Sequence, residues 1–124
     1  MSKALLADLI MTEPARFLVS LMHRHGQPAW YYRAGYVPEP MREKWALGLP
    51  HAHEIPFFFR TIDATDYVAP PTPADHAMSA MMSAYFVSFA RSADPNGPDR
   101  RTWPAYENAT RQIMDFTSTG PRGG

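Results

Sequence analysis

The chain has 124 residues, which is enough for one small domain, and its 45% apolar composition excludes a disordered tail. Twelve basic residues balance twelve acidic ones, so no charge excess points to nucleic acid or to an anionic membrane surface. Cysteine is absent, which excludes disulfides and thiolate metal sites and fits a reducing compartment, weakly favouring the cytoplasm.

The amino-terminal residues carry no predicted targeting signal. No apolar run reaches the ~20 residues that a membrane helix needs. Residues 1–14 have a short apolar patch but no small-residue cleavage site, so we predict neither a signal peptide nor a membrane span. Within this stretch, the spacing of the apolar residues predicts a short helix over residues 4–11.

A second helix is predicted to begin at Thr12 or Glu13, because Pro14 is well tolerated in a first turn. Gly26 can supply the left-handed residue that ends it. Its apolar stripe consists of Phe17, Leu18, Leu21 and Met22.

Residues 29–37 are aromatic and lie between two prolines, a pattern that predicts a strand. Residues 38–50 are expected to form a loop or an irregular helix, and residues 62–71 another connection. Between them, Pro56 is expected to limit any helix to about one turn before it.

The strongest helical pattern covers residues 73–91. Thr72, Pro73 and Asp75 predict a capping-box start with proline in the first position. Apolar residues then recur at helical spacing, and we interpret them as a buried core face rather than a ligand surface. These residues are Met78, Met81, Met82, Tyr85, Phe86 and Phe89.

The remaining residues are expected to form turns and extended segments. Residues 94–97 predict a turn, residues 103–106 and 112–116 short extended segments, and residues 120–124 a frayed end. Residues 29–37 are thus the only strand predicted from a strong pattern, and a lone strand has no pairing partner. We therefore expect its partner strands to come from polypeptide outside this chain.

Two His-x-His pairs raise the question of a metal site. His23 and His25 fall on a predicted helix, where positions two apart diverge by about 200°. His51 and His53 are not on an evident strand, so we assign no metal ligands, and a metal-binding module that uses the His-x-His pairs stays an alternative interpretation. A structural role is expected for His53 and for His76.

Residues 48–54, G-L-P-H-A-H-E, resemble the G-x-x-H-[GA]-x-E stretch of the type B carboxylesterase and cholinesterase-like family of α/β-hydrolases. Further stretches resemble the family in the same order. They are Asp8 with P-A-R at 14–16, G-Q-P-A-W-Y-Y-R at 26–33, E-I-P-F-F-F at 54–59, Y-F-V-S-F-A-R at 85–91 with D-P-N-G at 94–97, and W-P-A-Y at 103–106. The chain departs from the family pattern at Phe86, Ser88 and Ala93, where tryptophan, asparagine and glycine are usual.

The resemblance implies an α/β fold, with residues 1–124 forming the carboxy-terminal part of a single α/β-hydrolase domain that has one or two late strands. It implies that His51 is the general base of a Ser-Glu/Asp-His triad, whereas His53 and Glu54 are possible pocket or supporting residues. The chain contains no G-x-S-x-G nucleophile motif, so serine, oxyanion hole and triad acid are expected in a missing amino-terminal portion. An ester substrate is implied, and no cofactor.

Two other interpretations follow from the same residues. The chain can be a non-catalytic interaction domain that keeps the esterase framework, or a truncated product without a function of its own. In either case, exposed apolar surface is expected to favour self-association.

Overall fold

The structure is a computed structural model that describes residues 5–6, 8–117 and 120–123. The chain forms two compact units, which are described separately. Unit 1 comprises Met1–Arg33, Trp103–Met114 and Gly123–Gly124, and unit 2 comprises Ala34–Thr102 and Asp115–Arg122.

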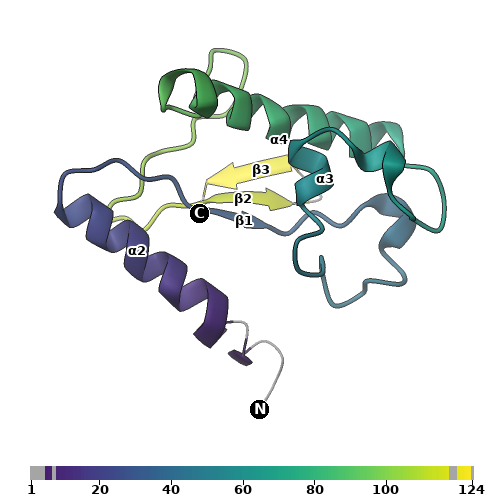
Figure 1. Cartoon of the computed structure of the whole chain (residues 1–124), viewed down its shortest axis with the longest axis horizontal. Helices are drawn as coiled ribbons and strands as arrows, with labels where there is room; N and C mark the ends of the chain where they lie inside the picture. The colour runs from purple at the N-terminus through teal and green to yellow at the C-terminus, as the bar shows by residue number, and fades with distance from the viewer. Residues whose placement is uncertain (1–4, 7, 118–119, 124) are drawn as a thin grey trace. The chain divides into compact units, whose positions relative to one another are not determined.

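The main element of unit 1 is helix α2, Glu13–Arg24, which begins after Thr12 as predicted (Figure 1). Gly26 adopts φ 69°, and the N–H of Gln27 reaches back to the carbonyl of Met22 at 2.9 Å, so the predicted glycine stop is confirmed. The preceding turn, Asp8–Thr12, is a π-helix (η1), and residues 5–6 are helical. Residues 4 and 7 of the predicted first helix lie outside the described residues.

Helix α2 leaves part of its apolar stripe exposed. Val19 is buried, but Phe17 and Leu18 remain 63% and 56% exposed. The sequence pattern marks an apolar face without showing how much protein covers it. The other part of unit 1, including the buried Trp103 and Tyr106, leaves Phe17 and Leu18 open.

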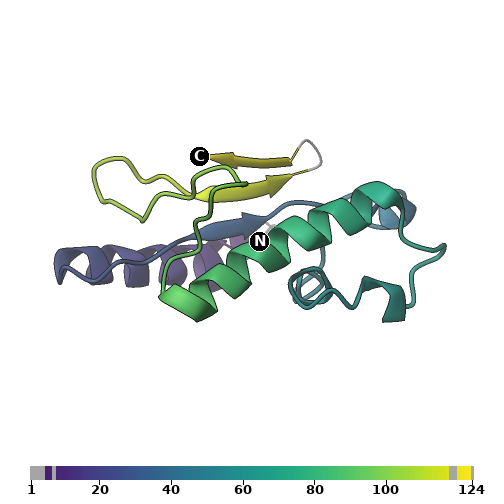
Figure 2. The same cartoon turned by 90° about the horizontal axis from the view of Figure 1, so that it is seen from above.

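Three short strands form one sheet in the order β1-β2-β3, namely β1 Tyr32–Ala34, β2 Met114–Thr117 and β3 Gly120–Gly123. The N–H of Met114 donates to the carbonyl of Tyr31 at 2.9 Å, and that of Gly35 donates to Phe116 at 2.8 Å. The register thus advances in the same direction along β1 and β2, which makes the pair parallel. Figure 2 shows β3 running along β2.

This sheet corrects four predictions. The strand at residues 29–37 is shorter than expected, and its partner is β2 of the same chain rather than a strand from elsewhere. The terminal residues 120–123 form a strand instead of a frayed end, and the fold has three strands rather than one or two. Parallel partners lie far apart in sequence, so local patterns do not reveal them. The extended segment at 112–116 is confirmed as β2, whereas residues 103–106 belong to no strand.

Unit 2 is built around helix α4, Pro73–Ser92, which has the predicted capping box between Thr72 and Asp75. Met78, Met82 and Tyr85 are buried, which confirms the core face. Phe86 and Phe89, at the edge of the predicted stripe, are partly exposed.

The short helix α3, Ile55–Phe58, packs against α4 (Figure 1). Pro56 lies in its first turn, so the proline begins this helix instead of ending one before it, contrary to our prediction. Two 3-10 turns complete the unit, η2 Glu39–Met41 and η3 Ile62–Ala64. The core of unit 2 contains Tyr36, Met41, Phe57, Phe58, Ile62, Met78, Met82, Tyr85 and Phe116. Among the described residues, no helix has the length and hydropathy needed to cross a membrane.

Candidate active site

His51 lies in a tight turn that leads into α3. The N–H of His53 donates to the carbonyl of Pro50 at 3.2 Å, and that of Ile55 donates to Ala52 at 3.3 Å. Ala52 adopts φ 66°, a left-handed conformation that is unusual for a residue with a Cβ atom. The chain therefore reverses sharply directly after His51, whose side chain is exposed.

His53 makes local contacts of a structural kind. Its Nδ1 donates to the backbone oxygen of His51 at 2.9 Å, and its ring meets the ring of Trp45 edge-on, with centroids 4.8 Å apart. Because Nδ1 carries the proton in this bond, the neutral ring has its free lone pair at Nε2. The bond also fixes the carbonyl of His51, so His53 stabilises the turn that holds the candidate base.

A hollow of about 340 Å³ borders the turn. The ring of Trp45 meets that of Tyr67 edge-on at 5.9 Å, and burial raises the pKa of Tyr67 above its usual value. The residues that line the hollow are His51, Ala52, His53, Pro56, Ala64, Thr65, Asp66 and Tyr67. The two histidines of the sequence motif therefore share one concave surface, which polar and apolar side chains line together.

Glu54 is half-buried at the start of α3. Its backbone oxygen accepts from the N–H groups of Phe57 at 3.0 Å and Phe58 at 3.3 Å. Within the described part of the chain, no hydrogen bond or ion pair joins the side chains of Glu54 and His51. Through its backbone, Glu54 stabilises the short helix that follows the turn.

Helix α4 anchors the segment that enters the turn. Asp75 is completely buried, and its carboxylate accepts from the Tyr36 hydroxyl at 2.8 Å and from the N–H groups of Glu39 at 3.0 Å and Thr72 at 2.8 Å. Burial, and then the hydrogen bond to Asp75, raise the pKa of Tyr36 well above its ordinary value. Three donors offset much of the cost of burying this charge.

The same helix also anchors the segment that leaves the turn. Ser79 is buried one turn after Asp75, and its hydroxyl donates to the backbone oxygen of Phe57 at 2.8 Å. Asp75 and Ser79 are four residues apart, so both side chains lie on one face of α4. The chain between Glu39 and Phe57, which includes His51, is thus fixed to α4 near both of its ends.

Sequence reasoning missed most of this anchoring. It assigned Asp75 to the capping box and gave Ser79 no role. The available signal was a pair of polar residues at i and i+4 beside an otherwise apolar stripe. In a buried helix face, such residues need hydrogen-bond partners from another segment.

Other histidines also have identifiable contacts. His76 Nε2 lies 3.2 Å from Asp63 Oδ1, and His23 Nδ1 accepts from the N–H of Asn108 at 3.3 Å. Across the described residues, no group of three histidine, aspartate or glutamate side chains is placed to hold a metal ion.

Comparison with known proteins shows the family of the chain. Residues 1–122 match the profile of the carboxylesterase family. The chain belongs to the carboxylesterase family. It is 28% identical over 116 residues to para-nitrobenzyl esterase of Bacillus subtilis, covering 92% of this chain and 23% of that protein. It is 34% identical over 107 residues to liver carboxylesterase 1 of Oryctolagus cuniculus, covering 83% and 18%.

A solved structure shows the same fold. The crystal structure of a carboxylesterase from Geobacillus stearothermophilus superposes with a TM-score of 0.79 at 23% identity, over 96% of this chain and 24% of that one. The chain is therefore part of an α/β-hydrolase fold, as the sequence predicts, and spans about a quarter of that carboxylesterase.

The departures from the carboxylesterase pattern have local explanations. Phe86 stacks on Phe58 with ring centroids 3.7 Å apart, and the Ser88 hydroxyl accepts from Arg100 Nη2 at 2.5 Å. Ala93 ends α4 with φ 59°, the conformation that glycine adopts most readily.

Proposed function

We propose that this chain is the segment of a carboxylic ester hydrolase that supplies the general base, His51, of a Ser-Glu/Asp-His triad. The serine and the triad acid belong to polypeptide outside this sequence. Membership of the carboxylesterase family carries the proposal, together with the matching motif around His51. Uncharged esters are the proposed substrates, and the amino-terminal portion of the hydrolase domain is the proposed partner.

In this mechanism the imidazole of His51 takes the proton of the serine hydroxyl as its oxygen attacks the ester carbonyl. The imidazolium then returns the proton to the departing alcohol. A second cycle, with water as the nucleophile, releases the acid and restores the serine. A carboxylate on the other ring nitrogen fixes the tautomer and stabilises the imidazolium, and the cycle needs no cofactor.

The local structure supports this role for His51. The side chain is exposed and lines a concave surface, where a serine from another segment has access to it. The left-handed Ala52 and the bond from His53 hold the backbone of the turn, and Asp75 and Ser79 anchor the flanking segments. A general base has to be held in place to act efficiently, and these contacts provide that rigidity.

The test is a chimera in which this chain replaces the segment that it matches in para-nitrobenzyl esterase of Bacillus subtilis. We expect the chimera to hydrolyse p-nitrophenyl esters, and His51→Ala to lower kcat by on the order of 10⁴-fold. His76→Ala is the matched control, since His76 pairs with Asp63 and does not line the hollow beside His51, and it should retain most of the activity.

Two outcomes decide between the proposal and its alternative. A chimera that folds and assembles without turnover would favour a non-catalytic interaction domain.

The 124-residue chain alone should hydrolyse esters no faster than free imidazole. Turnover by the isolated chain that disappears in His51→Ala would show that the nucleophile lies within this sequence.

A further inference from the structure

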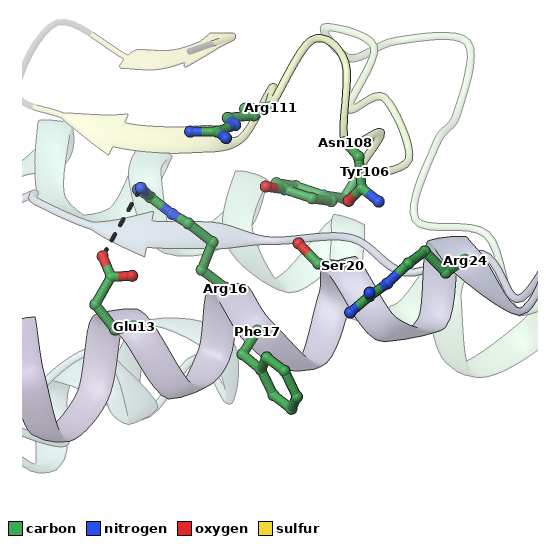
Figure 3. A pocket seen from close by; sticks show the side chains of 8 residues that line it. All are labelled: Glu13, Arg16, Phe17, Ser20, Arg24, Tyr106, Asn108 and Arg111. Carbon is green, nitrogen blue, oxygen red and sulfur yellow. Dashed lines mark ion pairs between the residues drawn. The ribbon is translucent and has the colours of Figure 1, made fainter.

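Unit 1 contains a second hollow, of about 430 Å³, unrelated to the His51 turn (Figure 3). It lies between one face of α2 and the segment that precedes β2. Three of its eight lining residues are arginines and one is acidic. The lining residues are Glu13, Arg16, Phe17, Ser20, Arg24, Tyr106, Asn108 and Arg111.

Helical periodicity places one wall of this hollow. Arg16, Ser20 and Arg24 are spaced by four residues on α2, so their side chains follow one face of the helix. Figure 3 shows the guanidinium of Arg16 and the hydroxyl of Ser20 turned toward the opposite segment, from which Tyr106 and Arg111 project. Two hydroxyls and three guanidinium groups therefore border one space.

The charges in this hollow do not balance. Glu13 lies 3.9 Å from Arg16, which is the ion pair that Figure 3 marks. Arg24 and Arg111 make no ion pair with any described residue. The last turn of α2 stabilises Arg24 through the helix dipole, but this explanation does not extend to Arg111, which lies on the opposite segment. Among the described residues, these two positive charges thus have no ion-pair partner.

The opposite wall is held rigidly. Tyr106 is buried, and its N–H donates to the carbonyl of Ala29 at 2.7 Å, while the N–H of Asn108 donates to His23 on α2 at 3.3 Å. Arg111 adopts φ 53° and donates its N–H to Glu107 at 2.8 Å. A non-glycine residue held in the left-handed region costs about 1–2 kcal/mol, and such costs concentrate at binding sites.

Asn108 adds an independent observation. Its side-chain oxygen is buried at the wall of the hollow and has no hydrogen-bond partner among the described residues. As it stands, this buried oxygen cannot contact an anion. If the carboxamide turns toward the hollow, its NH₂ group can donate to a bound anion.

We propose that this hollow binds a small phosphate ester. Guanidinium groups donate paired N–H bonds that match the oxygens of a phosphate, so Arg111 on one wall and an arginine of α2 on the other can donate to a dianion from two sides. Ligand binding offsets the repulsion between Arg16, Arg24 and Arg111. The site is separate in residues from the His51 turn and does not depend on ester hydrolysis.

The test is calorimetric titration of the 124-residue chain with glycerol 3-phosphate and with inorganic pyrophosphate at low ionic strength. We expect one saturable site per chain. Arg24→Gln and Arg111→Gln should each weaken binding about tenfold, the loss of one charge-assisted hydrogen bond. Arg91→Gln, on exposed α4 surface outside the hollow, is the matched control and should bind as the wild type does.

Ser20→Glu is a second test in case the arginine variants fail to fold. It adds a negative charge on the helix face without removing an arginine. It should abolish binding with little change in the helical circular dichroism signal. Binding to vesicles of phosphatidic acid is also measured, because these vesicles present a phosphate monoester on a lipid. Vesicles of phosphatidylcholine are the control. The proposal would be overturned if the chain bound only the phosphatidic acid vesicles or had no saturable site for the soluble esters. It would also be overturned if Arg91→Gln weakened ligand binding as much as the substitutions in the hollow.

Discussion

Two alanines occupy backbone conformations in which glycine costs less. Ala52 follows the candidate base His51 with φ 66°, and Ala93 ends α4 with φ 59°. A Cβ atom in this region approaches the following carbonyl oxygen, at a cost of roughly 1–2 kcal/mol per residue. Part of that cost is offset because alanine restricts the unfolded chain more than glycine does.

Ala93→Gly should therefore stabilise the protein by about 0.5–1 kcal/mol. The free energy of unfolding from urea titration measures this change. Ala77→Gly is the matched control, since Ala77 is exposed inside the same helix, and it should lower the free energy of unfolding by about 1 kcal/mol. Equal destabilisation by both variants would contradict the inferred strain at Ala93.

Asp75 should be among the most sensitive residues of unit 2. Asp75→Asn keeps the size but replaces one acceptor oxygen with an NH₂ group, which then faces the donors of Thr72 or of Tyr36 and Glu39. We expect the free energy of unfolding to fall by about 2–4 kcal/mol. Asp63→Asn removes an exposed carboxylate from its contact with His76 and should change stability by less than about 0.5 kcal/mol.

The raised pKa of Tyr36 predicts a loss of stability in alkali. An unfolded tyrosine loses its proton near pH 10, whereas burial and Asp75 keep Tyr36 protonated to higher pH. The stabilising effect is complete below about pH 10 and declines as the pH rises further. Tyr36→Phe should lower the stability at neutral pH but make its decline above pH 10 less steep. An unchanged slope in urea titrations at several pH values would contradict this.

At the level of elements, α4 organises unit 2. Its first two turns contribute Asp75 and Ser79, which fix the segments on either side of the His51 turn, and Met78, Met82 and Tyr85 contribute to the core. One helix thus supports both the packing of the unit and the position of the candidate base.

Local signals predicted the elements whose boundaries are set locally. The start of α4 was predicted correctly from the capping box of Thr72 and Asp75. The start and the end of α2 were predicted correctly from Pro14 and Gly26. The pairing of β1 with β2 depends on residues that are distant in sequence, so no local pattern contained it. Pro56 was misjudged because a proline permits a helix to start as readily as it prevents one from continuing.

The residues of the candidate site follow from the sequence motif, and their catalytic role stays a prediction, whereas the contacts that support the turn were not predictable. The motif around His51 drew attention to the turn, and the expected structural role of His53 fits its hydrogen bond to the His51 carbonyl and its ring contact with Trp45. The left-handed Ala52 had no signature, since alanine usually avoids that conformation. The sequence also could not show that Ser79 would find its partner in the backbone of Phe57.

At the level of the whole molecule, each unit exposes large apolar side chains. In unit 1 these are Leu5, Leu6, Leu9, Ile10, Met11, Phe17 and Leu18, and in unit 2 Leu47, Ile55, Phe59, Val68, Phe86, Val87 and Phe89. The chain spans only 18–24% of the carboxylesterases compared with it. Exposure on this scale favours association of the isolated chain.

We expect the isolated chain to self-associate as its concentration rises, with light scattering as the measurement. Leu18→Lys should weaken association by placing a charge on the exposed face of α2. Glu43→Gln produces the same change in net charge at an exposed polar site and is the control. A wild-type chain that stays monomeric at every concentration would show that these side chains do not drive association.

The central claim is that His51 moves the proton in ester hydrolysis, and chemical rescue tests it most directly. In the chimera with para-nitrobenzyl esterase, His51→Ala should leave a cavity beside the turn that free imidazole can enter. The account predicts that added imidazole restores p-nitrophenyl ester hydrolysis in a saturable way in His51→Ala, and has no such effect on His53→Ala. A His51→Ala chimera that retains the parent kcat without imidazole would contradict it.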